Sequence, residues 1–258
     1  MFATSTLYGF PVWAVFLGAL APLILATEGG FRGGRRLNKA RRQRAKFETG
    51  SLQASVLGLL ALFLGFTYSA SMSNFQERRL LVVKEANAIG TAYLRAQLLP
   101  KPMAQQASFS LRRYADLRLQ WALADEEQAS ASARLADAVQ QDLWALAVRL
   151  AEQDRSAVAG LFIGALNAII DVGAEREASH RNRIPIQMFG MLCLLAVVAM
   201  AITGYGCGIA GDRALAATTI VCALIAAVTV LILNIHEPRQ GFVHENLQSL
   251  IDARARME

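Results

Sequence analysis

Hydroxyl and amide side chains gather at one end of an apolar stretch that runs from Ser51 to Asn74. On a helix, Ser69 and Ser73 lie one turn apart and share a face. Leu62 and Phe66 continue that face toward the start of the stretch. In a ring of such helices, bulky apolar side chains close a pore by dewetting, and hydroxyl dipoles beyond them solvate an ion. The alternative interpretation is that the hydroxyls only hydrogen-bond neighbouring helices or their own backbone.

Titratable and nucleophilic side chains show no spacing that is typical of catalysis. The histidines and cysteines are His180, His236, His244, Cys193, Cys207 and Cys222. No two histidines have the spacing of a helical metal site, and the cysteines fit neither a zinc site nor a thiol redox motif. No serine lies in a Gly-x-Ser-x-Gly elbow. We therefore expect no catalytic residue, no metal, no cofactor and no enzymatic activity.

Four apolar segments are long enough to position these residues within a membrane. The chain has 258 residues, 54% of them hydrophobic, and its apolar residues separate into blocks. A bilayer core needs about 20 apolar residues per helix, and that length is reached by Leu7–Ala26, Ser51–Asn74, Ile184–Gly206 and Ala214–Ile235. A spanning segment must satisfy its own backbone groups, which favours helices. Because residues 1–10 contain no Lys or Arg, the first segment is interpreted as a retained helix rather than a signal peptide.

The fold class predicted from this pattern is all-α, with two transmembrane hairpins and a helical extramembrane region between them. Within that region, apolar residues recur at intervals of three and four, which indicates helices with one buried face. The segment 157–170 is apolar, but its roughly 14 residues are too few to span, and we interpret it as re-entrant or interfacial. The expected boundaries are 1–74 for the first hairpin with a basic loop at 28–50, 75–183 for the helical region, 184–235 for the second hairpin and 236–258 for a C-terminal tail.

Positive charge is concentrated between the first two segments. The net charge is +6, and eight basic residues crowd this link: Arg32, Arg35, Arg36, Lys39, Arg41, Arg42, Arg44 and Lys46. Lys and Arg in short loops favour the cytoplasmic side. We therefore expect the loop inside, region 75–183 outside, and contacts with anionic lipid headgroups from Arg35, Arg36, Arg41 and Arg42. Glycines at 29, 30, 33 and 34 should make the start of the loop flexible. Nucleic-acid binding is not expected.

Several short motifs follow the hydroxyl-rich segment. They include Leu64-Gly65-Phe66, then Glu77-x-Arg79, and then a stretch from Val83 to Leu99 that contains Glu85 and Asn87. This sequence resembles the second transmembrane helix of bestrophins and, over Val83–Leu99, a bacterial bestrophin-like membrane protein family of unknown function. Asn182-Arg183-Ile184-Pro185, which leads into the third apolar segment, is also similar. The order of segments agrees over nearly the whole chain.

The resemblance implies a pentameric anion channel whose pore is lined by the second transmembrane helix. Carried over, Leu62 and Phe66 are the pore constriction, with Ser69 and Ser73 beyond them, and chloride is a candidate permeant anion. One further turn back, Gly58 departs from the bulky residue of the family. The resemblance also implies a bacterial inner-membrane homo-oligomer with its helical middle region in the cytoplasm, opposite to the charge argument. The alternative function is a non-conducting membrane scaffold that binds a partner through region 75–183.

Overall fold

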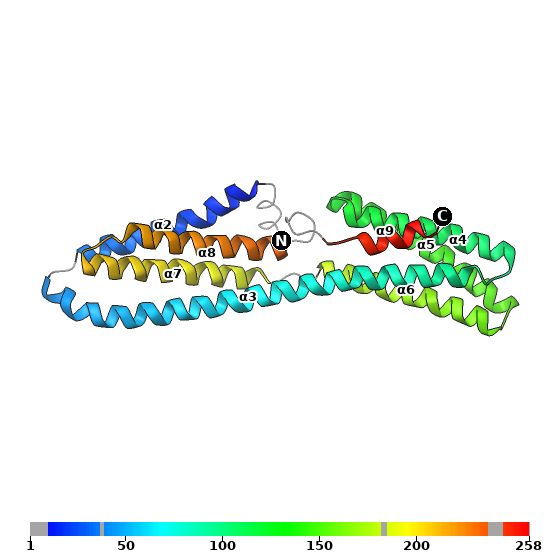
Figure 1. Cartoon of the computed structure of the whole chain (residues 1–258), viewed down its shortest axis with the longest axis horizontal. Coiled ribbons are helices and arrows are strands. Elements are labelled where there is room, and N and C mark those ends of the chain that lie inside the picture. Colours follow the sequence, from blue (N-terminus) through cyan, green and yellow to red (C-terminus); the bar gives the residue numbers. More distant parts are fainter. Residues whose placement is uncertain (1–9, 37–38, 182–184, 237–244, 258) are drawn as a thin grey trace. The chain divides into compact units, whose positions relative to one another are not determined.

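Long helices make up the structure, a computed structural model that describes residues 10–36, 39–181, 185–236 and 245–257. For residues 39–48, 126 and 186 only the backbone is described. Within these ranges there are eight helices and no strand (Figure 1). The helices are α2 (Val12–Arg35), α3 (Lys39–Ala96), α4 (Lys101–Leu123), α5 (Glu126–Gln153), α6 (Ala157–Arg181), α7 (Ile186–Ala210), α8 (Leu215–His236) and α9 (Gln248–Ala255).

The helix ends follow local sequence signals. Pro100 immediately precedes α4, where its fixed φ suits a helix start. Asp125 caps α5, and its carboxylate accepts a hydrogen bond of 2.9 Å from the backbone N–H of Gln128. Gly211 ends α7 with a φ of +83°, a conformation that glycine adopts without steric cost. These signals explain why the chain turns where it does.

The chain divides into two compact units. Unit 1 comprises residues 1–73 and 184–242, and unit 2 comprises residues 74–183 and 243–258. The helices described above, with no strand in the described residues, confirm the all-α class. The expected helical middle region corresponds closely to unit 2. The residues after α8 are shared between the units, and α9 belongs to unit 2 rather than to a separate tail.

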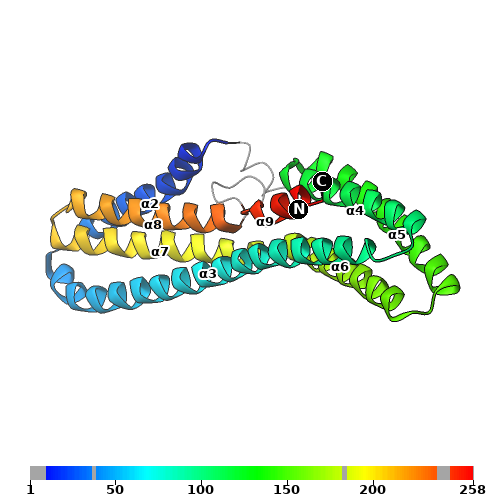
Figure 2. The same ribbon diagram turned by 45° about the vertical axis from the view of Figure 1, so that its right-hand side comes forward.

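Unit 1 is a bundle in which α2, α7, α8 and the first part of α3 run side by side (Figures 1 and 2). Its buried apolar core joins all four helices, with Leu23 from α2, Leu60 from α3, Met200 from α7 and Ile225 from α8. Burial of apolar surface within this core is supplemented by close backbone packing between α2 and α7.

Glycines create the contact between α2 and α7. A Cβ on Gly204 or Gly208 of α7 would overlap the carbonyl oxygens of Thr27 and Phe31 on α2, respectively. A Cβ on Gly30 of α2 would overlap the carbonyl oxygen of Ala201 in the same way. Small residues at such positions allow two membrane helices to approach closely. These glycines therefore allow the backbones of α2 and α7 to pack closely against each other.

This arrangement corrects two expectations about residues 28–50. The start of the supposed loop is helical, because α2 continues to Arg35. Helix α3 begins at Lys39, so only residues 36–38 separate the two helices. The glycine pairs reflect close packing, and the prediction of a flexible segment at 29–34 was wrong.

Among the residues that the structure describes, five helices are long and apolar enough to cross a membrane, where four were expected. They are α2, α3 from Thr49 to Ala96, α6, α7 and α8. The additional one is α6, whose apolar run was judged too short because it was counted only as far as Asp171. The helix in fact continues to Arg181 and has 25 residues. One face of α6 is buried in unit 2 through Phe162, Leu166 and Ile169.

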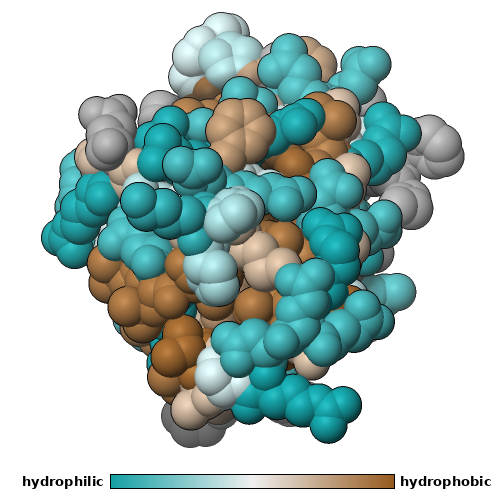
Figure 3. All heavy atoms as spheres, turned by 90° about the vertical axis from the view of Figure 1, so that its right-hand side faces the viewer, coloured by the Kyte–Doolittle hydropathy of each residue, from teal (hydrophilic) through white to brown (hydrophobic). Residues whose placement is uncertain are grey.

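Unit 2 packs α4, α5, α6, α9 and the later part of α3 around one apolar core. The core includes Ile89, Leu111, Leu143 and Phe162, all nearly inaccessible. Helix α9 and its flanks join this core through buried residues such as Leu250. Viewed from the side of α4–α6, mainly hydrophilic side chains cover the surface, with hydrophobic ones exposed between them (Figure 3). Unit 2 therefore has an apolar interior and, on the face seen in Figure 3, a mainly polar surface.

Candidate functional site

One face of α3 in unit 1 is left uncovered by the rest of the described chain. Leu62 is 53% exposed and Phe66 is 65% exposed. Gly58, Ser69 and Ser73 lie on the same face and are also exposed. We call these five residues the α3 stripe. It begins with apolar residues and ends with hydroxyls, as the sequence pattern indicated.

The opposite face of α3 packs into unit 1. Leu60 is 2% exposed and Thr67 is 1% exposed, and Ser71 is fully buried. The Thr67 hydroxyl donates a hydrogen bond of 2.8 Å to the carbonyl oxygen of Phe63 on its own helix. The hydroxyl residues of this segment therefore divide into a buried pair and an exposed pair. Thr67 and Ser71 fit the packing interpretation, whereas Ser69 and Ser73 remain available on the surface.

The residues of the family motif do not converge on a single site. Gly65, Glu77, Arg79 and Asn87 are exposed, whereas Glu85 is completely buried. The Gly65 position has open space where a Cβ would be. Only Glu85 therefore contributes to a buried polar site.

The expected lipid-contacting arginines lie at the junction of α2 and α3. Arg35 and Arg36 are exposed, and the Arg35 guanidinium carbon is 5.8 Å from the centre of the Phe31 ring. The side chains of Arg41 and Arg42 lie outside the described residues.

Unit 2 contains a buried charge cluster centred on Glu85. The Glu85 carboxylate accepts hydrogen bonds from Nε of Arg118 and Nη1 of Arg176. Arg118 also donates from Nη1 to Glu177 at 2.7 Å. All three of Glu85, Arg118 and Arg176 are almost inaccessible to solvent. Since an isolated charge is costly to bury, this mutual pairing is what allows them to lie inside the helical bundle.

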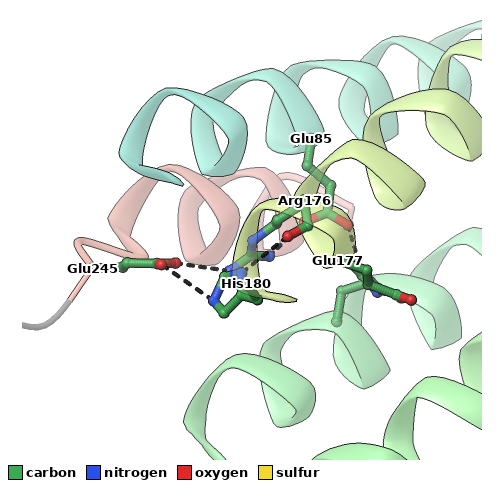
Figure 4. Close-up of polar contacts among 6 residues, drawn as sticks. Glu85, Arg176, Glu177, His180 and Glu245 are labelled. Atoms are coloured by element: carbon green, nitrogen blue, oxygen red, sulfur yellow. Dashed lines mark hydrogen bonds and ion pairs between the residues drawn. The ribbon is translucent and has the colours of Figure 1, made fainter. Parts of the chain in front are cut away.

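A second carboxylate, Glu245, extends the cluster from the segment before α9. Its oxygens lie 3.2 Å from Nε2 of His180, 3.5 Å from Nη2 of Arg176 and 3.4 Å from Nε of Arg78. Figure 4 shows Glu245 facing His180 and Arg176. Burial by itself would raise the pKa of Glu245, but the hydrogen bond and charge of His180 and the charges of Arg176 and Arg78 outweigh it, and the pKa is lowered. Glu245 is therefore held as a carboxylate.

Trp121 packs against three cationic or polar members of the cluster. Its ring centre lies 4.6 Å from the Arg118 guanidinium carbon, 4.9 Å from that of Arg176 and 4.6 Å from the His180 ring centre. Such contacts add cation–π attraction to the ion pairs. The neighbouring Tyr114 has a raised pKa because it is desolvated by burial. The cluster consists of mutually paired charges and contains no activated nucleophile, so its chemistry is structural.

Sequence reasoning singled out Glu85 through the motif but missed the partners of this residue. A signal was present, because Arg118 lies on the apolar stripe of α4 that contains Leu111, Tyr114 and Trp121. A charged residue at such a position predicts a buried ion pair. Its carboxylate partner, Glu85, comes from another helix 33 positions away, which no local pattern reveals.

The comparisons with known proteins agree with the fold. The model of the bestrophin-like domain matches residues 21–244. A mutant of a bacterial bestrophin homologue from Klebsiella pneumoniae superposes with a TM-score of 0.70 at 15% identity, covering 96% of this chain and 97% of that chain. Another mutant of a Klebsiella pneumoniae bestrophin homologue gives a TM-score of 0.66 at 15% identity, covering 94% and 97%. A search of functionally curated proteins finds no match. On the extent of the domain match, the chain belongs to the bestrophin-like family.

Proposed function

We propose that the protein is an oligomeric ion channel in which the α3 stripe lines the pore. The observation that carries this proposal is the order of side chains along the stripe: bulky Leu62 and Phe66 are exposed, and the exposed hydroxyls of Ser69 and Ser73 follow. The bestrophin-like fold supports the same conclusion at the level of the family.

In a closed ring of identical subunits, the α3 stripe of every subunit can face one central pore. In a cyclic oligomer the same helix of every subunit can surround the symmetry axis. Leu62 and Phe66 lie one turn apart, so each forms its own apolar collar in such a ring. The resemblance to bestrophins favours five subunits. Membrane lipids surround the assembly.

The two halves of the stripe have different roles in this channel. An apolar collar that is narrow enough to dewet prevents ions from passing in the resting state. The hydroxyls of Ser69 and Ser73 replace part of the hydration shell of an ion after the collar. We propose an anion such as chloride as the permeant species, because the resemblance is to anion channels.

The experiment compares conductance in reconstituted bilayers with symmetric chloride. Replacing Leu62 and Phe66 together with Ala widens and wets the collars, so the current per channel should rise several-fold. Tyr68→Ala is the matched control, because Tyr68 is an exposed aromatic residue on α3 about 120° from the stripe. If the double variant stays assembled but neither it nor the wild type conducts, a non-conducting scaffold is the better interpretation. A monodisperse monomer in mild detergent and in lipid discs would also contradict the channel.

We further propose that the basic segment within 28–50 is cytoplasmic and that region 75–183 is outside. Only residues 36–38 separate α2 from α3, so the Lys and Arg residues of the basic segment adjoin the two spans. Basic residues close to a span influence its orientation most strongly. In a variant without the native cysteines, an impermeant thiol reagent on intact cells should label Gln105→Cys but not Gly33→Cys. The reverse labelling would put region 75–183 in the cytoplasm, as the resemblance implies.

A further inference from the structure

A hollow in the surface of unit 2 lies between the end of α3 and the first turns of α4. It has a volume of about 470 Å³, within the range of roughly 300–1,000 Å³ that is usual for small-molecule sites. Its lining residues are Tyr93, Gln97, Ala104, Gln105, Ser108, Phe109 and Arg112. This set contains one cation and no carboxylate, so the hollow is electrostatically suited to an anion.

Arg112, which is partly buried, differs from the fully buried arginines Arg118 and Arg176 of unit 2. Arg118 and Arg176 are each paired with a carboxylate, whereas Arg112 contacts no carboxylate among the described residues. Its Nη2 donates to the Tyr93 hydroxyl at 3.1 Å. Its Nε is buried and has no hydrogen-bond partner in the described part of the chain. An unused buried donor on a charged group destabilises the fold, and an anionic ligand would relieve this penalty.

Tyr93 fixes the orientation of this guanidinium. Its hydroxyl donates a hydrogen bond of 2.9 Å to the carbonyl oxygen of Met257, a buried residue that follows α9. The hydroxyl therefore accepts from Arg112 and has no proton left to offer a ligand. The Arg112 guanidinium carbon lies 5.6 Å from the centre of the Tyr93 ring, which adds a cation–π contact. Arg112 is thus held at the wall of the hollow before any ligand arrives.

The remaining lining residues indicate which anion would fit. Ser108 offers a hydroxyl, and Gln97 and Gln105 offer amide groups that can donate hydrogen bonds. Phe109, which is 67% exposed, supplies an apolar wall. Arginine binds carboxylates with two parallel hydrogen bonds. We propose that this hollow is a binding site for a small organic carboxylate, with Arg112 holding the carboxylate and Phe109 contacting the apolar body of the ligand.

Benzoate is a suitable probe, and benzamide is its uncharged counterpart. The apparent melting temperature of the detergent-solubilised, full-length protein is measured against each probe up to 50 mM at constant ionic strength, with chloride as the balancing anion. Benzoate should raise the melting temperature saturably, and benzamide should not. Failure of benzoate to act below 50 mM, or an equal effect of benzamide, would overturn the proposal.

Two neighbouring arginines separate specific binding from a general charge effect. Arg112→Met should weaken the response to benzoate at least tenfold, whereas Arg113→Met, at an exposed position next to it, should preserve it. Equal responses of the two variants, whether both retained or both lost, would contradict the assignment. Because Arg112→Met removes a partly buried side chain, Gln105→Glu provides a second test at an exposed position of the same hollow. The added carboxylate should repel benzoate and weaken binding at least tenfold, and an unchanged affinity would also overturn the proposal.

Discussion

Replacement of Glu85 by Gln tests whether the buried charge cluster holds unit 2 together. Gln has nearly the same shape as Glu but is neutral, so the substitution removes charge with little change in volume. It retains one oxygen that can accept a hydrogen bond. Its amide group then faces the second of two guanidinium donors, Arg118 and Arg176. Both cations would remain buried, and one of them would lose its acceptor on residue 85.

The expected loss of stability is large because neither cation can reach solvent. Removing one partner of a buried ion pair typically costs about 3–5 kcal/mol. Arg118 keeps its contact with Glu177 at 2.7 Å, but Arg176 keeps only the longer contact of 3.5 Å with Glu245. For a unit of this size, 1 kcal/mol corresponds to roughly 3–5 °C in melting temperature. Glu85→Gln should therefore lower the apparent melting temperature of unit 2 by about 10–20 °C.

Tryptophan fluorescence of the full-length protein in detergent can follow this transition, because Trp121 lies against Arg118 and Arg176. Glu77→Gln is the matched control, since it removes the same charge from an exposed position of the same helix. A surface substitution of this kind should change stability by no more than about 0.5 kcal/mol. A melting temperature of Glu85→Gln within about 3 °C of the wild type, below the roughly 3–5 °C expected per kcal/mol, would refute the reasoning. So would equal losses in the two variants.

Two further predictions concern helix packing and pH. Gly204→Ala should reduce the yield of folded, monodisperse protein in size-exclusion chromatography, because its Cβ would overlap the Thr27 carbonyl and overpacking costs about 1–3 kcal/mol. Gly29→Ala, which meets nothing within 4 Å, should leave the yield unchanged, and equal yields would contradict the close contact. The lowered pKa of Glu245 means that its carboxylate stabilises the fold fully above its ordinary pKa of 4.5, and that this contribution is lost as the pH falls through the lower, folded-state value. The difference in melting temperature between the wild type and Glu245→Gln should therefore shrink as the pH falls below the ordinary value of 4.5. A difference that stays the same on acidification from about pH 5 to about pH 3 would show that the charge of Glu245 is not responsible.

The helical class and the family were predictable because both depend on contiguous residues. Apolar runs of membrane length identify helices without knowledge of their neighbours. The motif from Leu64 to Leu99 identified the bestrophin-like family, which the domain match confirms. The number of candidate spans was less predictable. Helix α6 combines an apolar first half with Arg176 and Glu177, so its length could be judged only once its C-terminal end at Arg181 was known.

The glycines at positions 29–34 show why composition alone misled the prediction of a loop. Glycine lowers the intrinsic stability of an isolated helix by about 1 kcal/mol per residue, which favours a flexible segment when only the local sequence is considered. In unit 1, the absence of a side chain at Gly30 and Gly34 lets α2 approach the backbone of α7. The packing partner, near Ala201 and Tyr205, is far away in the sequence. Local propensity was overridden by a contact between distant segments.

The α3 stripe and the Glu85 cluster show what helical periodicity can and cannot predict. Periodicity predicted which hydroxyls share a face, and the structure separates exposed Ser69 and Ser73 from buried Thr67 and Ser71. It could not predict which of the two faces packs into unit 1, because that depends on distant segments that share the same core. The same limit applies to Glu85, whose burial depends on cations from α4 and α6. A repeat of three and four residues therefore defines the faces of a helix, and only tertiary contacts decide which face becomes core and which remains exposed.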